Sequence, residues 1–449
     1  MKTYNELTQR YLDAWSAQDQ LTVRQLRDSV RPRLARTIFQ GNTLSRPGFL
    51  ERAEVAQVAE DMETLYRLVT SLPDKLFGGD LGAFAASTGI TPAQVQAVVR
   101  GQGGAPSRLA RADLYRDETG FRVMELNMSS AIGGIDVATV NRAMLELPFI
   151  ADFVEQHELG YTDTMRELVE TLRIECNVPE GSRPAVALCD WPASYVTLEE
   201  QLQANVSVFG ALGVDALPCH VGQLRLEEDS IWLGDRQIDV LFRLFLMEDL
   251  LDPAGPQLIE PVLRAAERGN VALFSPMGSE LYSSKGVLAL LSDEANRHLF
   301  DERELATLDR CLPWTRMVRP GPVTVTVPTG RVLLEDYALA EREELILKPT
   351  LLHGGSGVIP GWQTEPGEWK GLIADAMDKE YVLQRRIHPF TEPFPVADGP
   401  GFEDWVLLWG VFLGARGYAG TFLRGTPMGE TGVVNMATGA TGSCCFHQS

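Results

Sequence analysis

The first hundred residues carry apolar side chains at the three- to four-residue spacing of amphipathic helices. The first such stripe consists of Tyr4, Leu7, Tyr11 and Trp15. A second stripe runs from Val55 to Leu72, and Pro73 is expected to end its helix. A third helix is expected to start at Pro92, because proline suits the first helical turn. Such stripes are typical of core-facing helices, so this region predicts a helical leader rather than a ligand site.

A β-hairpin is predicted from Arg111 to Asn127, where polar and apolar residues alternate. Its loop is expected to have three residues and to end at Gly120, because glycine readily adopts the left-handed conformation. In that register Asp113 lies opposite Glu125, and Arg111 lies opposite Asn127. Residues two apart on a strand share one face, so we expect these polar side chains to gather on one side of the hairpin.

Strands alternate with helices from about residue 184 onward. The apolar runs 185–189, 239–245 and 271–274 are strand candidates, and helices are expected over 198–212 and 261–268. This pattern predicts a small open sheet with covering helices.

The last third of the chain is dominated by β-strand patterns. Strands are expected over 345–349, 381–384, 405–413 and 418–423, the last two joined by a turn at 414–417. Residues 389–401 contain four prolines and are expected to form a loop or a lid.

Composition and charge narrow the class of protein. The 449 residues include 40 Lys and Arg against 61 Asp and Glu, so the formal net charge is −21. This charge repels polyphosphate and argues against a nucleic-acid partner. No apolar run predicts a membrane span, and the first residues lack the apolar core of a secretory signal. The six cysteines show no C-x-x-C pair, so we expect reduced thiols in a cytoplasmic protein.

The hairpin is a candidate metal site. Asp113 and Glu125 repel each other across the two strands unless a positive charge lies between them. Mg²⁺ satisfies that need, because it prefers carboxylate and amide oxygens, and Asn127 supplies an amide. The alternative is a solvated hairpin with ordinary ion pairs.

A glycine-rich loop follows Lys348 and contains Gly354, Gly355 and Gly357. Glycines let backbone N–H groups approach phosphate oxygens, and the lysine adds a positive charge. The neighbouring His353 is a further candidate for a phosphate contact. A plain surface turn is the alternative.

Three other residues are candidates with ordinary alternatives. Lys285 is expected near the start of an apolar helix, where the N-terminus attracts anions, although a solvated lysine fits equally. Arg424 either faces a nucleotide or pairs with a nearby acid such as Glu430. Cys189 ends a buried strand and is expected to pack rather than to act as a nucleophile.

Taken in chain order, these residues form a set of short motifs. They are Arg111-x-Asp113, Glu125-x-Asn127, Ser284-Lys285-Gly286, Lys348-Pro349, Tyr381-x-x-Gln384 and Gly417-x-x-Gly420-x-x-x-Arg424. The set resembles the ATP-grasp carboxylate–amine ligases, and more narrowly the circularly permuted synthetases related to the glutathionylspermidine synthetase domain. The resemblance covers roughly residues 107–443, and the hairpin is its most specific part. The helical leader and the His353 loop depart from that family, so glutathione and spermidine are not carried over.

The resemblance implies three roles. The ligands of Mg²⁺ would be Asp113, Glu125 and Asn127. The nucleotide would be held by Lys285, Lys348, Gly354, Gly355, Gly357, Gln384 and Arg424, with Gln384 on the adenine side. The transferred phosphoryl group and the substrate carboxylate would be contacted by Arg111, Ser129 and Ser130.

We therefore expect an α/β (α+β) fold of the circularly permuted ATP-grasp type, with a helical leader and a small open sheet like a pre-ATP-grasp domain. The expected divisions are the leader at 1–106, the hairpin with following helices at 107–180, a substrate-side α/β domain at 181–275, and the nucleotide-binding part at 276–449.

The expected reaction uses ATP and Mg²⁺ to join a carboxylic acid, such as an amino acid or peptide, to an amine through an acyl phosphate, releasing ADP and phosphate. The partners would be these small molecules, with no nucleic acid and no membrane. A small-molecule kinase without ligation and a non-catalytic nucleotide-binding protein are the alternatives.

Overall fold

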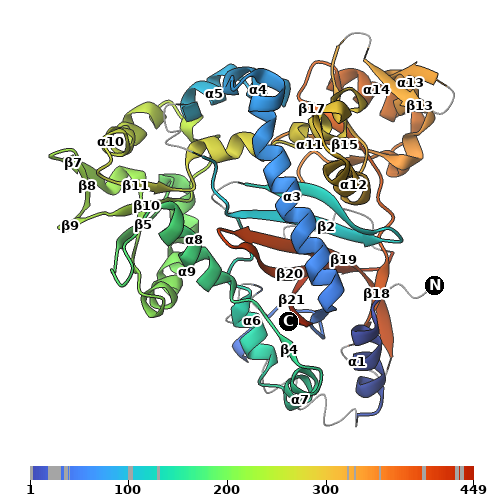
Figure 1. Cartoon of the computed structure of the whole chain (residues 1–449), viewed down its shortest axis with the longest axis horizontal. Helices are drawn as coiled ribbons and strands as arrows, with labels where there is room; N and C mark the ends of the chain where they lie inside the picture. The colour runs from blue at the N-terminus through green and yellow to red at the C-terminus, as the bar shows by residue number, and fades with distance from the viewer. Residues whose placement is uncertain are drawn as a thin grey trace.

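A sheet of eight strands crosses the middle of the molecule and joins the beginning of the chain to its end (Figure 1). The strand order is β1-β21-β20-β19-β2-β3, while β18 pairs with β19 and β4 pairs with β21. These strands are β1 (Gly48–Leu50), β2 (Ala110–Asp117), β3 (Gly120–Asn127), β4 (Leu159–Gly160), β18 (Thr391–Pro395), β19 (Phe402–Gly414), β20 (Gly417–Pro427) and β21 (Thr441–Gln448). The computed structural model describes residues 4–18, 32–34, 39, 41–99, 105–128, 132–320, 323–327, 330–352, 355–396, 401–429, 434 and 439–448.

The long hairpin of β19 and β20 forms the centre of this sheet, in agreement with the apolar runs of the sequence. The predicted turn at 414–417 is confirmed, because Gly414 pairs with Gly417. Strand β19 pairs with β20 on one side and with β2 on the other. The hairpin of β2 and β3 is therefore an extension of a buried sheet, which fixes its position in the molecule.

Helix α3 (Arg52–Phe77) lies across this sheet (Figure 1), and its apolar stripe is buried as the spacing predicts. The prediction that Pro73 ends the helix is wrong, because the helix continues to Phe77 and closes at Gly78, whose φ is +59°. The added turn brings Phe77 against Phe84, with ring centroids 6.0 Å apart. This packing offsets the one backbone hydrogen bond that a proline inside a helix cannot make.

The leader contains a strand as well as helices. Helix α1 (Glu6–Ser16) and the start of α5 (Pro92–Val99) at Pro92 confirm two predictions. The sequence did not predict β1, which pairs in parallel with β21 and aligns Gly48 with Cys445. A strand of three residues is too short to show a period of two.

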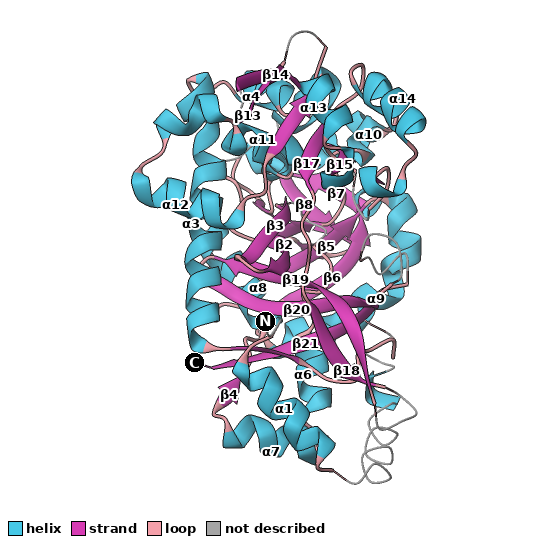
Figure 2. Ribbon diagram, turned by 90° about the vertical axis from the view of Figure 1, so that its right-hand side faces the viewer, coloured by secondary structure: helices cyan, strands magenta, loops and turns pink. Residues whose placement is uncertain are grey.

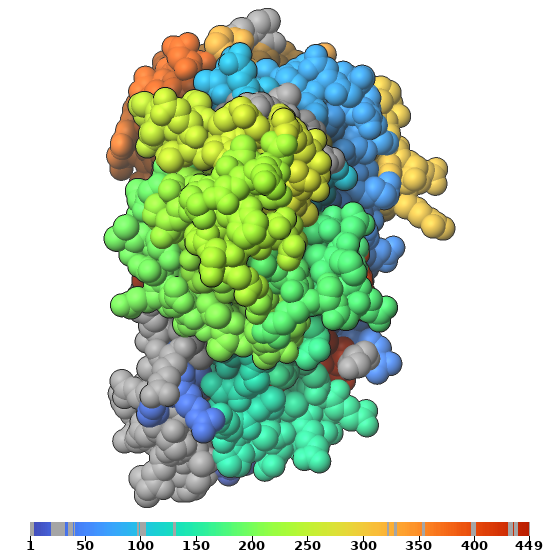
Figure 3. Space-filling model, turned by 90° about the vertical axis from the view of Figure 1, so that its left-hand side faces the viewer, coloured from blue at the N-terminus to red at the C-terminus, as the bar shows by residue number. Residues whose placement is uncertain are grey.

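A second sheet is entirely parallel and has the order β11-β10-β5-β6. Its strands are β5 (Ala185–Asp190), β6 (Asp215–His220), β10 (Val240–Arg243) and β11 (Ala272–Phe274), and they confirm the three predicted runs in this region. Helices α9 (Pro192–Ala211) and α10 (Gly255–Glu267) are also present, although both begin earlier than predicted. Figure 3 shows this region, coloured green to yellow-green, in the middle of one face of the molecule.

A third sheet, antiparallel and of four strands, lies above the large sheet in Figure 2. It has the order β12 (Thr315–Val318), β17 (Tyr381–Arg385), β15 (Leu345–Pro349) and β16 (Ile359–Pro360). Strands β15 and β17 confirm the runs predicted at 345–349 and 381–384. Lys348 pairs with Val382 on β17, so its backbone is fixed at the centre of this sheet.

The prediction that residues 389–401 form a loop or lid is wrong for their first half. Strand β18 pairs with β19 from Thr391 to Pro395. Prolines are tolerated there because β18 lies at an edge, where a missing N–H leaves no ladder bond unmade. The buried ion pair of Arg46 with Glu392, 2.8 Å long, further fixes this strand.

Smaller elements complete the fold. The remaining α-helices are α4 (Leu81–Ser87), α6 (Ala138–Met144), α7 (Pro148–Gln156), α8 (Thr164–Glu175), α11 (Lys285–Ser292), α12 (Glu302–Cys311), α13 (Leu334–Ala340) and α14 (Pro366–Ala376). The remaining strands are β7 (Leu224–Glu227), β8 (Ser230–Leu233), β9 (Arg236–Gln237), β13 (Thr324–Val327) and β14 (Gly330–Leu333). None of the helices in the described part of the chain is both long and apolar enough to cross a membrane.

Candidate active site

A cleft lies between the hairpin of β2 and β3 and the third sheet, and it encloses about 510 Å³, part of it open to solvent. Its polar lining comes from four separate stretches of chain. The charged residues in this lining are Asp113, Glu125, Lys285, Lys348 and Arg424. Side chains separated by up to 311 positions in the sequence thus meet at one place.

The hairpin has the register that the sequence predicts. Asp113 pairs with Glu125, and Arg111 pairs with Asn127. Paired residues of an antiparallel ladder point to the same face, so one face carries all four polar side chains. Strand β2 of the hairpin pairs with β19. Nδ2 of Asn127 donates to the carbonyl of Arg111 at 3.4 Å.

The loop of the hairpin differs from the prediction, although the register does not. Asp117 pairs with Gly120 across a two-residue turn instead of a three-residue loop. The ladder then shifts by one residue between Leu114 and Asp113, so that Met124 has no partner on β2. This β-bulge supplies the extra residue that we had assigned to the loop.

Asp113 is held by two arginines. Nε of Arg111 donates to its Oδ1 at 2.7 Å, and Nη2 of Arg111 donates to its Oδ2 at 3.0 Å. Nη2 of Arg424 donates to the same Oδ2 at 2.6 Å. Burial alone would lower the pKa of Arg111, but Asp113 and Glu125 raise it above its ordinary value. Of the two sequence-based alternatives for Arg424, pairing with an acid is confirmed, but the acid is Asp113, and Glu430 lies outside the described residues.

Glu125 faces two lysines. Nζ of Lys285 lies 3.2 Å from its Oε2, and the Glu125 side chain keeps 25% of its surface exposed. Loss of solvent contact favours the neutral acid. The positive charges of Lys285, Lys348 and Arg111 outweigh this effect and hold the pKa of Glu125 below its ordinary range. Burial lowers the pKa of Lys348 to about 8, with Glu125 opposing and Lys285 adding to the decrease. Glu125 is therefore ionised at neutral pH. Lys348 loses its proton about one pH unit above neutrality.

The start of helix α11 positions Lys285. The hydroxyl of Ser284 accepts from the N–H of Gly286 at 3.1 Å and so caps the helix. The backbone N–H of Lys285 donates to the carbonyl of Thr350 at 2.9 Å, and its Nζ donates to that of Leu352 at 3.0 Å. The predicted place of Lys285 at a helix start is confirmed, and these bonds tie that start to the chain that follows β15.

Lys348 is positioned by a short chain of hydrogen bonds. Its Nζ donates to Oε1 of Gln384 at 2.7 Å, and Nε2 of Gln384 donates to Oγ1 of Thr315 at 3.2 Å. Gln384 was expected to line the adenine side, whereas its side chain is buried against Lys348 and Thr315. It acts on the cleft through the lysine. Thr315 carries no motif, so its part in this chain was not predicted.

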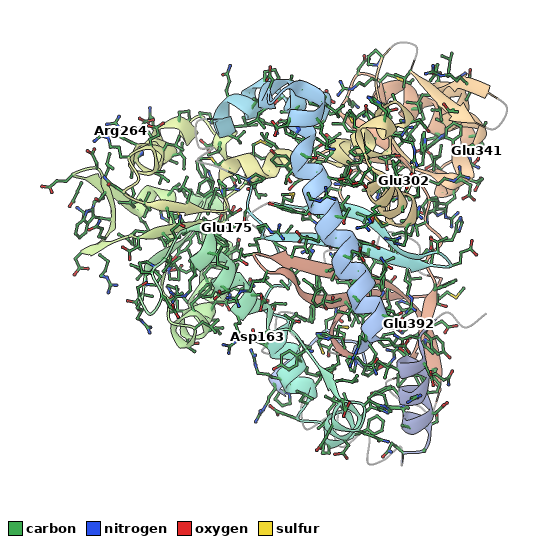
Figure 4. All side chains as sticks on the ribbon, viewed as in Figure 1. Asp163, Glu175, Arg264, Glu302, Glu341 and Glu392 are labelled. Atoms are coloured by element: carbon green, nitrogen blue, oxygen red, sulfur yellow. The ribbon has the colours of Figure 1, made fainter. Side chains whose placement is uncertain are left out.

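The cleft is electropositive in an acidic protein. Four cations, Arg111, Arg424, Lys285 and Lys348, share two carboxylates, which leaves an excess of two positive charges when all are ionised. Acidic residues elsewhere, such as Glu302 and Glu341, are spread over different elements (Figure 4). A cleft with an excess of positive charge attracts negatively charged ions. The arrangement therefore suits an anionic ligand.

An apolar wall completes the cleft. Its residues are Tyr115, Met124, Ile346, Leu352, Val358, Leu408 and Val434. Sequence reasoning did not single them out, although the period of two would have placed Tyr115 beside Asp113 and Ile346 beside Lys348. A wall of this kind packs against the flat, uncharged part of a ligand.

Several predicted residues cannot be placed in the cleft. Ser129, Ser130, His353 and Gly354 lie outside the described residues. Gly355 lines the cleft, and the neighbouring Gly357 has a φ of +69°, a conformation that favours glycine. Cys189 is fully buried, and burial raises its pKa well above the ordinary thiol value, as expected for a packing residue.

The donor set fits Mg²⁺ bound together with a phosphate ligand. Within the described ranges, no group of three or more His, Cys, Asp and Glu side chains could hold a metal by itself. Mg²⁺ usually takes one or two carboxylates, waters and substrate phosphates. A carboxylate accepts about four hydrogen bonds, and the three arginine bonds on Asp113 leave room for one further ligand. Glu125 and the amide oxygen of Asn127 are the other donors.

Comparison with known proteins shows a similarity of fold but no match in sequence. No protein-family model and no curated protein matches the sequence. A glutathione synthetase like-effector from Globodera pallida has a TM-score of 0.61 at 12% identity, over 96% of this chain and 98% of that chain. A γ-glutamylcysteine synthetase candidate from Methylobacillus flagellatus KT has a TM-score of 0.42 at 12% identity, over 87% and 86%. D-alanyl-alanine synthetase A from Vibrio cholerae O1 biovar eltor has a TM-score of 0.26 at 11% identity, over 52% and 68%.

At 12% identity, the similarity to the Globodera pallida protein concerns the fold alone. A shared fold does not by itself define an activity or a substrate. The predicted mixed α/β fold class is confirmed at this level, because the chain shares its fold with a glutathione synthetase like-effector.

Proposed function

We propose that this protein is an ATP-dependent ligase that activates a carboxylic acid as an acyl phosphate and transfers the acyl group to an amine. One observation carries the proposal: two arginines and two lysines from separate segments converge on a pair of facing carboxylates. Phosphoryl transfer depends chiefly on cations positioned before charge develops. The fold shared with a glutathione synthetase-like protein supports the same reaction class.

The nucleotide occupies the lysine side of the cleft in this proposal. Lys285 and Lys348 bind the phosphates, and the backbone at Gly355 approaches them closely. The apolar wall packs against the base. Mg²⁺, held by Asp113, Glu125 and Asn127, would neutralise phosphate charge when bound.

The first chemical step is attack by a carboxylate oxygen of the acid on the γ-phosphorus of ATP. The bond from that phosphorus to the β–γ bridging oxygen breaks, and ADP leaves. Arg111 stabilises the negative charge on the transferred group, while the two lysines hold the phosphates of the nucleotide. Ser129 and Ser130, which directly follow the hairpin, are the proposed contacts of the acid.

The second step forms the amide. The amine nitrogen attacks the acyl carbon, and Arg111 stabilises the tetrahedral oxyanion with its fixed guanidinium fork. Phosphate then leaves with the electron pair of the C–O bond, and the nitrogen releases its proton. The acid and the amine are small molecules, and an amino acid or peptide is the proposed acid.

A hydroxamate assay tests this function. The full chain is incubated with Mg·ATP, hydroxylamine and pools of amino acids, peptides and small carboxylic acids. Hydroxamate formed together with an equal amount of ADP is the expected result, and it identifies the acid. Hydroxamate formed with AMP would replace the acyl phosphate by an adenylate. ADP with a stable phosphorylated product and no hydroxamate would favour a kinase.

A further inference from the structure

Two guanidinium groups share one aromatic ring beside the cleft. The Cζ atom of Arg111 lies 5.4 Å from the ring centroid of Phe422, and the Cζ atom of Arg424 lies 5.2 Å from it. Both distances fall within the range of about 6 Å for cation–π attraction. Phe422 is only 2% exposed, so this attraction acts away from bulk water, where it is stronger.

The ring lies where it does because its cross-strand neighbour is a glycine. Phe422 on β20 pairs with Gly410 on β19, and Gly410 pairs with Asp113 on β2. A Cβ atom on Gly410 would lie 2.0 Å from Cε1 of Phe422. The absence of a side chain at this position lets the ring extend over β19 toward the strand that carries Arg111.

Further contacts enclose the ring, among them that of Phe39, whose ring centroid lies 6.4 Å away. A Cβ atom on Gly134, whose φ is +87°, would lie 3.1 Å from the ring of Phe422. The ring of Phe412 stacks on it with centroids 5.6 Å apart. The ring is therefore confined, and it defines a fixed surface for the two arginines.

The two arginines need such support, because a single carboxylate between them leaves one positive charge in excess. Asp113 bonds both, yet the guanidinium groups repel each other. The negative face of an aromatic ring offsets part of this repulsion. Among the described residues, Nε of Arg424 has no hydrogen-bond partner although it is buried. One N–H of the pair is thus left without an acceptor.

We propose that Phe422 is a positioning residue: seated over Gly410, it acts with Asp113 to hold Arg111 and Arg424 as a preformed pair of guanidinium groups for phosphoryl and carboxylate oxygens. This inference rests on the proposed function. Phe422 itself touches no substrate. It acts by keeping the two donors in place before the ligand arrives, which lowers the ordering cost of binding.

The test measures binding of inorganic phosphate, a product of the proposed reaction, to the full chain saturated with Mg·ADP, by isothermal titration calorimetry. Phe422→Leu removes the ring but keeps an apolar side chain, and Phe422→Tyr keeps the ring. Phe446→Leu is the matched control, because Phe446 is a fully buried ring on the same sheet whose described ring contact is with Tyr161. Phe422→Met replaces Phe422→Leu if the latter does not fold, because methionine fills irregular gaps.

We expect Phe422→Leu to weaken phosphate binding about tenfold while the affinity for Mg·ADP changes less than about twofold. Phe422→Tyr and Phe446→Leu should both stay within about threefold of the wild type. Wild-type phosphate affinity in Phe422→Leu would overturn the proposal. Equal weakening in Phe446→Leu would also overturn it, because lost packing would then explain the effect.

Binding measurements on the wild-type protein distinguish failure of this inference from failure of the proposed function. Binding of Mg·ADP without binding of phosphate would overturn the role of the arginine pair and leave the nucleotide half of the proposed function standing. Failure to bind either ligand would contradict the proposed function itself.

Discussion

The two carboxylates that face each other across the hairpin have opposite surroundings. Asp113 is 2% exposed and accepts three hydrogen bonds from two arginines. Glu125 keeps 25% of its side chain exposed, and its closest cation is Lys285 at 3.2 Å. Arginine binds a carboxylate through a rigid planar fork, whereas lysine is a compact charge on a flexible stem. One side of the site is therefore preformed, and the other can rearrange.

This difference matches the two tasks of the proposed reaction. The transferred phosphoryl group and the oxyanion require donors at fixed positions, which Arg111 and Arg424 supply. The nucleotide must enter and leave in each cycle, and Lys285 can exchange Glu125 for a phosphate. The comparison thus separates chemistry on the arginine side from nucleotide binding on the lysine side.

The largest effect is expected from Arg111→Lys. A lysine keeps the charge but cannot bond both oxygens of Asp113 or hold the transferred group with two donors. ADP release with the acid found by the hydroxamate assay should fall about a thousandfold at saturating Mg·ATP. The affinity for Mg·ADP, measured by calorimetry, should change less than about threefold. A loss of nucleotide affinity as large as the loss of rate would contradict the separation.

Glu125→Gln should affect nucleotide binding on the lysine side of the cleft. The variant loses the carboxylate that faces Lys285 and Lys348 and that belongs to the proposed Mg²⁺ site. We expect the affinity for Mg·ADP to fall about a hundredfold. Affinity for ADP in the presence of a chelator should instead rise, because the two lysines lose their competing anion. Titrations with and without Mg²⁺ check this reversal, and unchanged Mg·ADP binding would remove Glu125 from the metal site.

A rise in pH should have a moderate effect on the affinity for ADP. Burial lowers the pKa of Lys348 to about 8, so the lysine is charged at pH 7 and mostly neutral at pH 9. Glu125, whose pKa is held below its ordinary range, stays ionised throughout. Metal-free ADP affinity should therefore fall, by up to about tenfold, as pH rises from 7 to 9. Lys348→Arg keeps its charge over this range and should flatten the profile. If ADP affinity fell equally with pH in both proteins, a group other than Lys348 would be responsible for the pH dependence.

The local parts of the site could be predicted from the sequence. Strand alternation, which is a property of neighbouring residues, placed the polar side chains of the hairpin on one face, and Asp113 pairs with Glu125 as expected. The helix start at Lys285 follows from its capping serine and the apolar run behind it. In both cases the determining residues lie within about a dozen positions of each other.

The long-range parts could not be predicted. The ion pair of Arg424 with Asp113 joins residues 311 positions apart, and it depends on a strand order that local patterns do not encode. The prediction for the loop of the hairpin was wrong because a two-residue turn with a bulge gives the same register as a three-residue loop. Strand β18 was missed because its prolines indicate a turn unless the strand is known to lie at an edge.

The smallest effect is expected from Thr315→Val, which tests how rigid the lysine side is. The substitution keeps the shape of the side chain but removes the acceptor for Nε2 of Gln384, which is 3.2 Å away in the wild type. Gln384 would then be free to rotate, so its bond to Lys348 would weaken. An uncharged hydrogen bond contributes about 1 kcal/mol, so ADP affinity should fall only about threefold to fivefold. The reaction rate at saturating Mg·ATP should stay within about twofold, because the arginine side is untouched. A large fall in that rate would mean that Lys348 needs the same fixed geometry as Arg111, and the two sides of the site would no longer differ in kind.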